Sequence, residues 1–281
     1  MPRASRIVSI VRKGVVSTHR PRVLASCVMA DSPHSGRDYP ADFRHDCDPA
    51  LLRQAEDAYL DKLLDFLPAI GIPFVQAHFP RSYIDPNRPQ HAPDLLRSSI
   101  TPRYQVPIYK AAPGAREAFN RYARYHKPYH DAICAVRSEA RETFGRVVHL
   151  NCHSMPSVLL EGNEPYPYDI VIGTRGGATA APQLAAKLKS LFEARGYRVI
   201  VDAQGFRGAE IVRRSGKPDK NAHALQIEIN RALYLDEKNV TLRQPDATKL
   251  RHDLRQVLSA FRDYCDGPAF ARKPPARKYK R

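Results

Sequence analysis

The stretch Ala224-Leu-Gln-Ile-Glu-Ile-Asn230 alternates apolar and polar residues, which is the pattern of a β-strand with two different faces. Its three aliphatic residues share one face, and Glu228 lies on the other. A carboxylate inside a strand either faces solvent at the edge of a sheet or lies in a site that stabilises its charge, because burying an unpaired charge is costly. The pattern leaves both interpretations of Glu228 open.

The rest of the chain alternates strand and helix patterns around this stretch. Short apolar runs bounded by turn residues predict further strands at residues 22–30, 71–77, 146–151, 169–172 and 197–201. Helical spacing of apolar residues predicts helices at residues 49–66, 115–144, 181–195 and 246–264. Asp48 followed by Pro49 is typical of a helix start, and Pro128 predicts an interruption or kink in the second helix. Strands that alternate with helices favour an α/β sandwich with a largely parallel sheet.

Positive charge is concentrated at the two ends of the 281-residue chain. Residues 1–20 carry five Lys or Arg and residues 271–281 carry six, without a single acid, so eleven of the +16 net charge lies there. We expect one domain over residues 21–266, with a disordered basic extension at residues 1–20 and a disordered basic tail at residues 267–281. Such ends can attract nucleic acid or an anionic membrane, but solvated ends without a partner explain the charge equally well.

Several protein classes are disfavoured by what the sequence lacks. No apolar stretch reaches the ~18 residues of a membrane span, and we expect no secretory signal. Five cysteines, an odd number without CxxC spacing, indicate reduced thiols in a cytoplasmic protein. The absence of GxGxxG, GxxxxGK[ST], HExxH and GxSxG argues against dinucleotide enzymes, P-loop NTPases, HExxH zinc proteases and α/β-hydrolases.

Two histidines and one carboxylate fall where a parallel sheet gathers its ligands. His34 follows the first predicted strand, His153 follows the third, and Glu228 lies in the sixth. Ligands of open parallel sheets bind at the carboxyl ends of the strands. Two histidines with nearby carboxylates suit a catalytic zinc site, which keeps one position open for water.

A second histidine pair competes with this interpretation. His126 and His130 are four residues apart on a predicted helix and therefore share a face. They either bind a metal or form part of a polar, aromatic face packed beside the cleft.

The segment from Arg81 to Pro89 concentrates groups that bind anions. It contains Arg81, Asn87 and Arg88, and a planar guanidinium group matches a carboxylate bidentately. The segment is either a clamp for an anionic substrate or a loop stabilised by a pair between an arginine and Asp85.

Seven short motifs, in this order, resemble the N-formylglutamate amidohydrolase family over roughly residues 22–240. They are Ser32-Pro-His-Ser-Gly36, Glu56-Asp57-x-x-x-Asp61, Arg81-x-x-x-Asp85-x-Asn87-Arg88-Pro89, Pro128-Tyr-His130, His153-Ser-Met155, Ile172-Gly-Thr174 and Gln226-Ile-Glu228-Ile-Asn230. The family is similar in fold to the zinc carboxypeptidases and aspartoacylases. The resemblance therefore implies a three-layer α/β/α sandwich with a mixed, largely parallel sheet and one zinc ion in its cleft.

The resemblance also implies a role for each residue of the metal centre. His34 and His153 match the zinc-binding histidines, and the acidic ligand is expected at Asp57, with Glu56 as the alternative. Because Asp57 lies 23 residues after His34, the chain between them must fold back. Glu228 matches the glutamate that acts as general base and then as proton donor.

For the substrate, the resemblance implies a small anionic N-acyl amino acid. Asn87 and Arg88 match the pair that receives its carboxylate, with Arg81 as a second candidate; Arg37, Arg175 or either clamp arginine could bind a second carboxylate. The implied reaction is hydrolysis of N-formyl-L-glutamate to L-glutamate and formate, as in histidine degradation. Two alternatives stay open: the same zinc chemistry on another N-acyl amino acid or a short peptide, and a nucleic-acid- or membrane-associated protein on a degenerate scaffold.

Overall fold

The computed structural model describes residues 6–100, 106–158 and 164–271, and within them one large sheet organises the molecule. The eight strands of this sheet, among the described residues, are β1 (Ile7–Arg12), β2 (Val16–Pro21), β3 (Val28–Ser32), β4 (Phe74–Ala77), β5 (Val147–Met155), β6 (Ile170–Gly173), β7 (Val199–Val201) and β8 (Ala222–Asn230). Their spatial order is β1-β2-β4-β3-β5-β8-β6-β7. A short hairpin of β9 (Leu235–Asp236) and β10 (Thr241–Leu242) lies apart from it.

The four central strands, β4, β3, β5 and β8, run parallel to one another. β2 is antiparallel to β4 and to β1, and β6 is antiparallel to β8 but parallel to β7. The sheet is therefore mixed with a parallel centre, as the sequence predicts.

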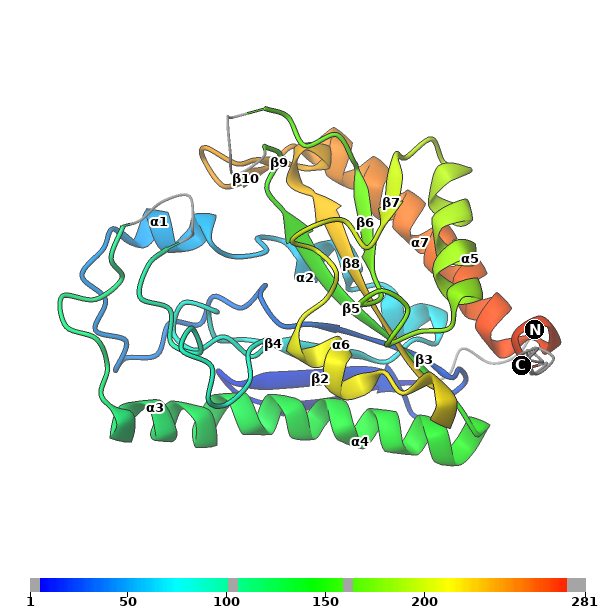
Figure 1. Cartoon of the computed structure of the whole chain (residues 1–281), viewed down its shortest axis with the longest axis horizontal. Helices are drawn as coiled ribbons and strands as arrows, with labels where there is room; N and C mark the ends of the chain where they lie inside the picture. Colours follow the sequence, from blue (N-terminus) through cyan, green and yellow to red (C-terminus); the bar gives the residue numbers. More distant parts are fainter. Residues whose placement is uncertain (1–5, 101–105, 159–163, 272–281) are drawn as a thin grey trace, which may run out of the picture.

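Helices cover both faces of the sheet. They are α1 (Pro49–Gln54), α2 (Leu60–Leu64), α3 (Ala115–Arg121), α4 (Lys127–Phe144), α5 (Pro182–Glu193), α6 (Glu210–Ser215), α7 (Gln244–Asp266) and α8 (Pro268–Ala271), with short 3₁₀ turns at Leu67–Ile70, Pro218–Lys220 and Arg231–Leu233. α4 and α6 pack on one face, and α2, α5 and α7 lie on the other (Figure 1). The three-layer α/β/α architecture is thus confirmed. Among the described residues, no helix has both the length and the apolar character that a membrane crossing requires.

The central strands are buried on both faces, but the two faces differ in polarity. In β5, Val148, Leu150 and Cys152 join the core under α2, α5 and α7. His149 and Asn151 alternate with them and face the α4 side. A sheet covered by helices on both faces has no solvent-exposed side, so these polar residues must find partners inside the protein.

The expectation of a disordered extension at residues 1–20 is wrong for residues 7–20. These residues form β1, β2 and the turn between them, where Gly14 adopts a positive φ of 71°. Val15 and Val16 are buried in the core on the α4 side, so the second strand belongs to the domain. Residues 1–5 and 272–281 lie outside the described residues, and so does most of the predicted basic tail.

The first predicted helix begins at Pro49, capped by Asp48, but it breaks into α1 and α2. Tertiary hydrogen bonds replace the helical ones at the break. The backbone N–H of Asp57 donates to the carbonyl of His34 at 3.0 Å, and Arg231 donates to the carbonyls of Gln54 and Glu56 at 3.0 and 2.8 Å.

The second predicted helix runs without a gap through α3, one π turn at Tyr122–His126, and α4. Pro128 is the second residue of α4, just after this turn, where its missing N–H is tolerated. The interruption predicted near Pro128 therefore takes the form of a π turn.

Candidate active site

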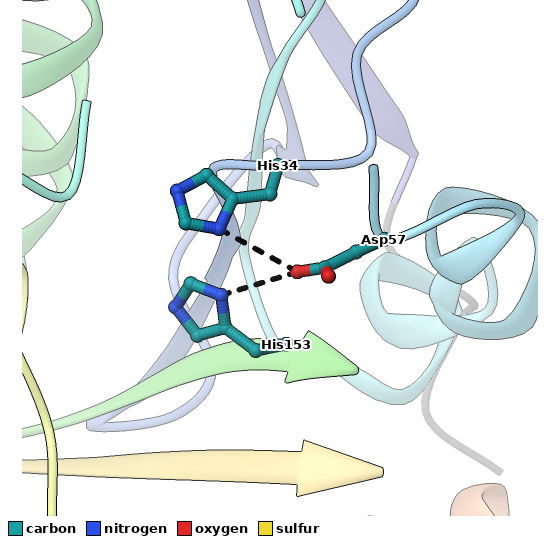
Figure 2. A group of neighbouring side chains, drawn as sticks. All are labelled: His34, Asp57 and His153. Atoms are coloured by element: carbon teal, nitrogen blue, oxygen red, sulfur yellow. Dashed lines mark hydrogen bonds and ion pairs between the residues drawn. The ribbon is translucent and has the colours of Figure 1, made fainter. Parts of the chain in front are cut away.

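Three side chains from distant parts of the chain meet at the carboxyl edge of the parallel strands. His34 lies in the loop after β3, His153 lies near the end of β5, and Asp57 lies in the break between α1 and α2 (Figure 2). Both rings turn Nδ1 towards Oδ2 of Asp57, at 3.1 Å for His153 and 3.6 Å for His34. As expected from their separation of 23 residues, the chain between His34 and Asp57 folds back and brings the two side chains together.

The other nitrogen of each ring is held by an oxygen. Nε2 of His34 lies 2.7 Å from Oδ1 of Asp85, and Nε2 of His153 lies 2.8 Å from Oδ1 of Asn151. Asp85 can only accept, which assigns the hydrogen of His34 to Nε2, and at His153 the shorter contact, to Asn151, assigns it in the same way. The lone pair of each Nδ1 then faces Asp57, as in metal-binding histidines whose remote nitrogen is held by a carboxylate or an amide oxygen.

Asp57 is fully buried and stays ionised. Burial alone would raise its pKa, but the rings of His153 and His34 beside Oδ2 hold this pKa well below its usual range. Its other oxygen, Oδ1, accepts from the Ser154 hydroxyl at 3.1 Å and from Arg231 at 3.3 Å.

Glu56, the alternative acidic ligand, is not part of the group formed by His34, Asp57 and His153. It accepts hydrogen bonds from Tyr39 and Arg53. Burial raises the pKa of Glu56 to about 7, partly offset by Arg53. The neighbour of Glu56, Asp57, is the carboxylate that joins the histidine pair.

The donor set fits a divalent cation. One ligand atom from each of His34, Asp57 and His153 lies within 4.8 Å of the others. Nδ1 of His34 is a buried nitrogen with no hydrogen-bond partner among the described residues, which a bound cation would explain. Two histidines and one carboxylate are a known ligand set of catalytic zinc.

A buried network behind His153 fixes the amide of Asn151. Its nitrogen donates to both oxygens of Asp31, at 2.9 and 3.1 Å, which turns Oδ1 towards His153. Asp31 also bonds Nε2 of His149 at 2.7 Å and the hydroxyl of Tyr129 at 2.6 Å. This network was not predicted from the sequence, although the polar residues that alternate within the buried strand β5 indicate it.

Glu228 lies beside this group, on the neighbouring strand. It is in register with His153, on the same face of the sheet, and is 6% exposed. Gln226 donates to its Oε1 at 2.7 Å. Burial raises the pKa of Glu228 to about 7, an effect partly offset by His153. Of the two interpretations of Glu228, the structure supports a buried site, because β8 is a central strand rather than an edge.

The arginine segment contains the pair with Asp85 and also lies at the wall of the cavity. Arg81 pairs with Asp85 at 2.9 Å, and Arg81, Asn87 and Arg88 all line the same cavity. The amide nitrogen of Asn87 lies 3.2 Å from Nε2 of His153. Arg97, which also lines the cavity, was missed because it lies in a proline-rich stretch without recognisable spacing.

His126 and His130 do not contribute to the candidate metal group. Their rings stack 4.4 Å apart, and each Nε2 lies near a backbone carbonyl: that of Arg88 at 2.9 Å for His126, and that of Pro86 at 2.8 Å for His130. The pair therefore holds the backbone on both sides of Asn87, and the packed polar face is the supported alternative.

The candidate site opens into a cavity of about 890 Å³. His34, His153 and Glu228 line it together with the arginine segment. This volume suits a small molecule. The exposed Arg37 and Arg175, considered as further anion-binding residues, are not among the residues that line the cavity.

Comparison with known proteins agrees with this geometry. The sequence model of the N-formylglutamate amidohydrolase family matches residues 26–235. An N-formylglutamate deformylase of Pseudomonas aeruginosa is 30% identical over 253 residues, covering 83% of this chain and 92% of that protein. One of Pseudomonas putida is 31% identical over 218 residues, covering 73% and 80%.

A solved structure extends the agreement to the fold. The crystal structure of N-formylglutamate amidohydrolase from Ralstonia eutropha JMP134 superposes with a TM-score of 0.83 at 31% identity, covering 90% of this chain and 98% of that one. The resemblance found in the sequence is confirmed, and the chain belongs to the N-formylglutamate amidohydrolase family.

Proposed function

We propose that this protein is a zinc-dependent amidohydrolase that converts N-formyl-L-glutamate and water into L-glutamate and formate. The observation that carries the proposal is the convergence of both Nδ1 atoms and Asp57 beside the buried Glu228, in a chain of this family. His34, Asp57 and His153 would hold the metal. A bound zinc ion lowers the pKa of a water molecule and polarises a carbonyl group.

Glu228 would move the protons of the reaction. As general base it takes a proton from the water that attacks the formyl carbonyl, and it then gives that proton to the departing amine nitrogen. A pKa of about 7 suits both directions of transfer near neutral pH. Because the site is buried, the charge that forms during the reaction is poorly screened by water and depends on such fixed groups.

Asn87 and Arg88 would bind the carboxylate next to the scissile amide. Both line the cavity, and Asn87 lies against His153. The side-chain oxygen Oδ1 of Asn87 accepts from the backbone N–H of Ile211 at 2.9 Å, so the amide nitrogen of this side chain is held towards His153. Fixing the substrate in this way converts binding energy into orientation.

Replacing Glu228 by glutamine tests the mechanism. Glu228→Gln keeps the size of the side chain but removes the base, so kcat for release of glutamate should fall by about 10²- to 10⁴-fold. The bound metal, measured by mass spectrometry, should be unchanged. Glu237→Gln makes the same change at another carboxylate that lines the cavity, and should keep kcat within about threefold of the parent, in line with a peripheral substitution. A Glu228→Gln variant as active as this control would show that Glu228 is not the base.

The other expectations drawn from the sequence stay predictions. They are another N-acyl amino acid as substrate, a place in histidine degradation, a cytoplasmic location and contact with nucleic acid or membrane through the basic ends. Much of those ends lies outside the described residues.

A further inference from the structure

The face of the sheet that carries Glu228 becomes apolar on the next strand. In the antiparallel pair of β8 and β6, Glu228 is in register with Val171, so their side chains lie on the same face. Val171 is fully buried and belongs to a small apolar cluster against which Tyr166 and Phe206 pack. The rings of Tyr166 and Phe206 meet edge to face, with their centroids 5.6 Å apart. An aromatic surface thus begins directly beside the candidate base.

This surface continues along the wall of the cavity. Tyr166 and Phe206 line the cavity together with Leu235 of β9 and Val240 of the turn that joins β9 to β10. These four residues form what we call the apolar wall. Leu235 is 4% exposed, and the other three are partly buried. Because contact with water disfavours apolar surface, the apolar part of a ligand would stabilise this wall.

The apolar wall and the arginine segment lie on opposite sides of the candidate metal group. The strands of the site follow one another in the order β4, β3, β5, β8 and β6. The arginine segment follows β4, His34 follows β3, His153 lies in β5, and Tyr166 precedes β6. Because β6 runs antiparallel to β8, its beginning lies at the same edge of the sheet as the end of β8. A substrate with its carboxylate on the arginine segment and its amide at the metal group therefore directs its acyl group towards the apolar wall.

Val240 is held in an unfavourable backbone conformation. Its φ is 49°, in the left-handed region that glycine or asparagine adopts more easily than a β-branched residue. Its side chain packs against the core under α2, α5 and α7 and also lines the cavity. Strained residues persist where the surrounding structure holds them, and they are common at ligand sites. The apolar side chain serves either the core or a ligand, and a polar substitution that fits the same backbone separates the two.

Building on the function proposed above, we propose that the apolar wall binds the acyl group of the substrate, and that the enzyme also hydrolyses N-acyl amino acids with an unbranched alkyl chain of several carbons. The C–N bond breaks, and water supplies the hydroxyl group of the new fatty acid and the proton of the departing amine. A formyl group has only a hydrogen on its carbonyl carbon and leaves the apolar wall in contact with water. The cavity of about 890 Å³ has room for a longer chain, because sites for drug-sized ligands measure ~300–1,000 Å³.

The test compares N-acetyl-, N-butanoyl- and N-hexanoyl-L-glutamate, with N-formyl-L-glutamate as the reference substrate. The first three share one amide chemistry and differ only in the alkyl chain. Each buried methylene group favours the longer chain by up to about fourfold, so kcat/KM of the parent should rise from acetyl to hexanoyl by at least about tenfold. Product inhibition gives an independent measurement. Hexanoate should inhibit the parent at least about tenfold more strongly than acetate, because the two share the carboxylate and differ in the chain.

Two variants assign this preference to the apolar wall. Val240→Asn fits the left-handed backbone and replaces the apolar side chain by a polar one of similar size, and Phe206→Ala removes an aromatic ring. In each, the ratio of kcat/KM for the hexanoyl substrate to that for the acetyl substrate should fall by at least about threefold, mainly through KM. A partly unfolded variant loses both rates equally and leaves this ratio unchanged. Val23→Asn makes the same change at a position that is 72% exposed and does not line the cavity, and it should keep the ratio of the parent.

Two results would overturn the inference while leaving the proposed function intact. One is a parent enzyme that hydrolyses N-formyl-L-glutamate but does not prefer the hexanoyl substrate to the acetyl substrate. The other is a preference that both Val240→Asn and Phe206→Ala retain in full, which would place the alkyl chain elsewhere in the cavity. If the parent hydrolysed none of these substrates, the proposed function itself would fail.

Discussion

Single side chains in this site act through buried partners. His153 is oriented by Asn151, and Asn151 is oriented in turn by Asp31. His34 depends in the same way on Asp85, which is fully buried. Burial alone would raise the pKa of Asp85, but His34, Arg81 and Arg97 hold it well below its usual range. His34 is thus fixed by a group 51 residues away, and His153 by Asn151, whose own partner Asp31 lies 120 residues from it.

A buried histidine outside the cleft predicts how stability depends on pH. Burial at the start of β8 lowers the pKa of His223 to about 4. In the unfolded chain His223 has an ordinary pKa of about 6.5, so between about pH 6.5 and 4 it binds a proton there but not in the folded protein. The stability is therefore fully present above about pH 6.5 and is lost as the pH falls towards 4, by up to about 1.4 kcal/mol per pH unit for this group.

His223→Gln should weaken this acid sensitivity. Urea unfolding between about pH 6.5 and 4.5 gives the free energy of unfolding at each pH, and its slope against pH reports how many protons are taken up on unfolding. In this variant, the uptake should be smaller than in the parent by up to about one proton. His252→Gln, at an exposed position of α7, should keep the slope of the parent. Equal slopes in the two variants would contradict the low pKa of His223.

At the scale of elements, local pattern predicted the start of the first helix but not the break within it. Asp48 and Pro49 identified the start of α1, because capping is a contact within the first turn. The break after Gln54 depends on Arg231, about 175 residues away, and no local pattern reports it. The alternation in β8 identified the face of Glu228, because it is set by the strand itself.

The N-terminal hairpin of β1 and β2 is an ordered element that the sequence did not predict. Its basic residues suggested a solvated end, and the residues of β1 are mostly exposed. Its place in the sheet depends on pairing with β4, more than fifty residues later, as in Val16 with Ala77. Composition reports charge but not pairing, so the sequence alone favoured disorder.

Matched substitutions in the hairpin test its place in the domain. Val16 is 7% exposed in the core, whereas Val11 on β1 is 57% exposed. Val16→Asp buries a charge and should lower the free energy of unfolding by about 3 kcal/mol or more. Val11→Asp should change it by no more than about 0.5 kcal/mol. If denaturant unfolding found both variants as stable as the parent, residues 7–20 would not be part of the folded core.

At the scale of the whole molecule, the parallel strands bring the two candidate metal-binding histidines and the candidate base close together. β3, β5 and β8 are neighbours that end at one edge, so His34, His153 and Glu228 meet although they are far apart in sequence. Their place at one edge could be predicted from the parallel sheet that alternating strands and helices favour. Asn151 and Arg97 could not, because their roles come from contacts that have no fixed spacing along the chain.

Metal binding by the parent enzyme and two neighbouring variants is the most direct test of the central claim. The parent should bind about one zinc per chain, lose its turnover when a chelator removes it, and regain turnover when zinc returns. Asp57→Asn should weaken zinc binding by at least about tenfold, while Glu56→Gln, one residue away, should bind zinc as the parent does. A chelated, metal-free enzyme that keeps its turnover, or zinc binding that depends on Glu56 and not on Asp57, would contradict the account.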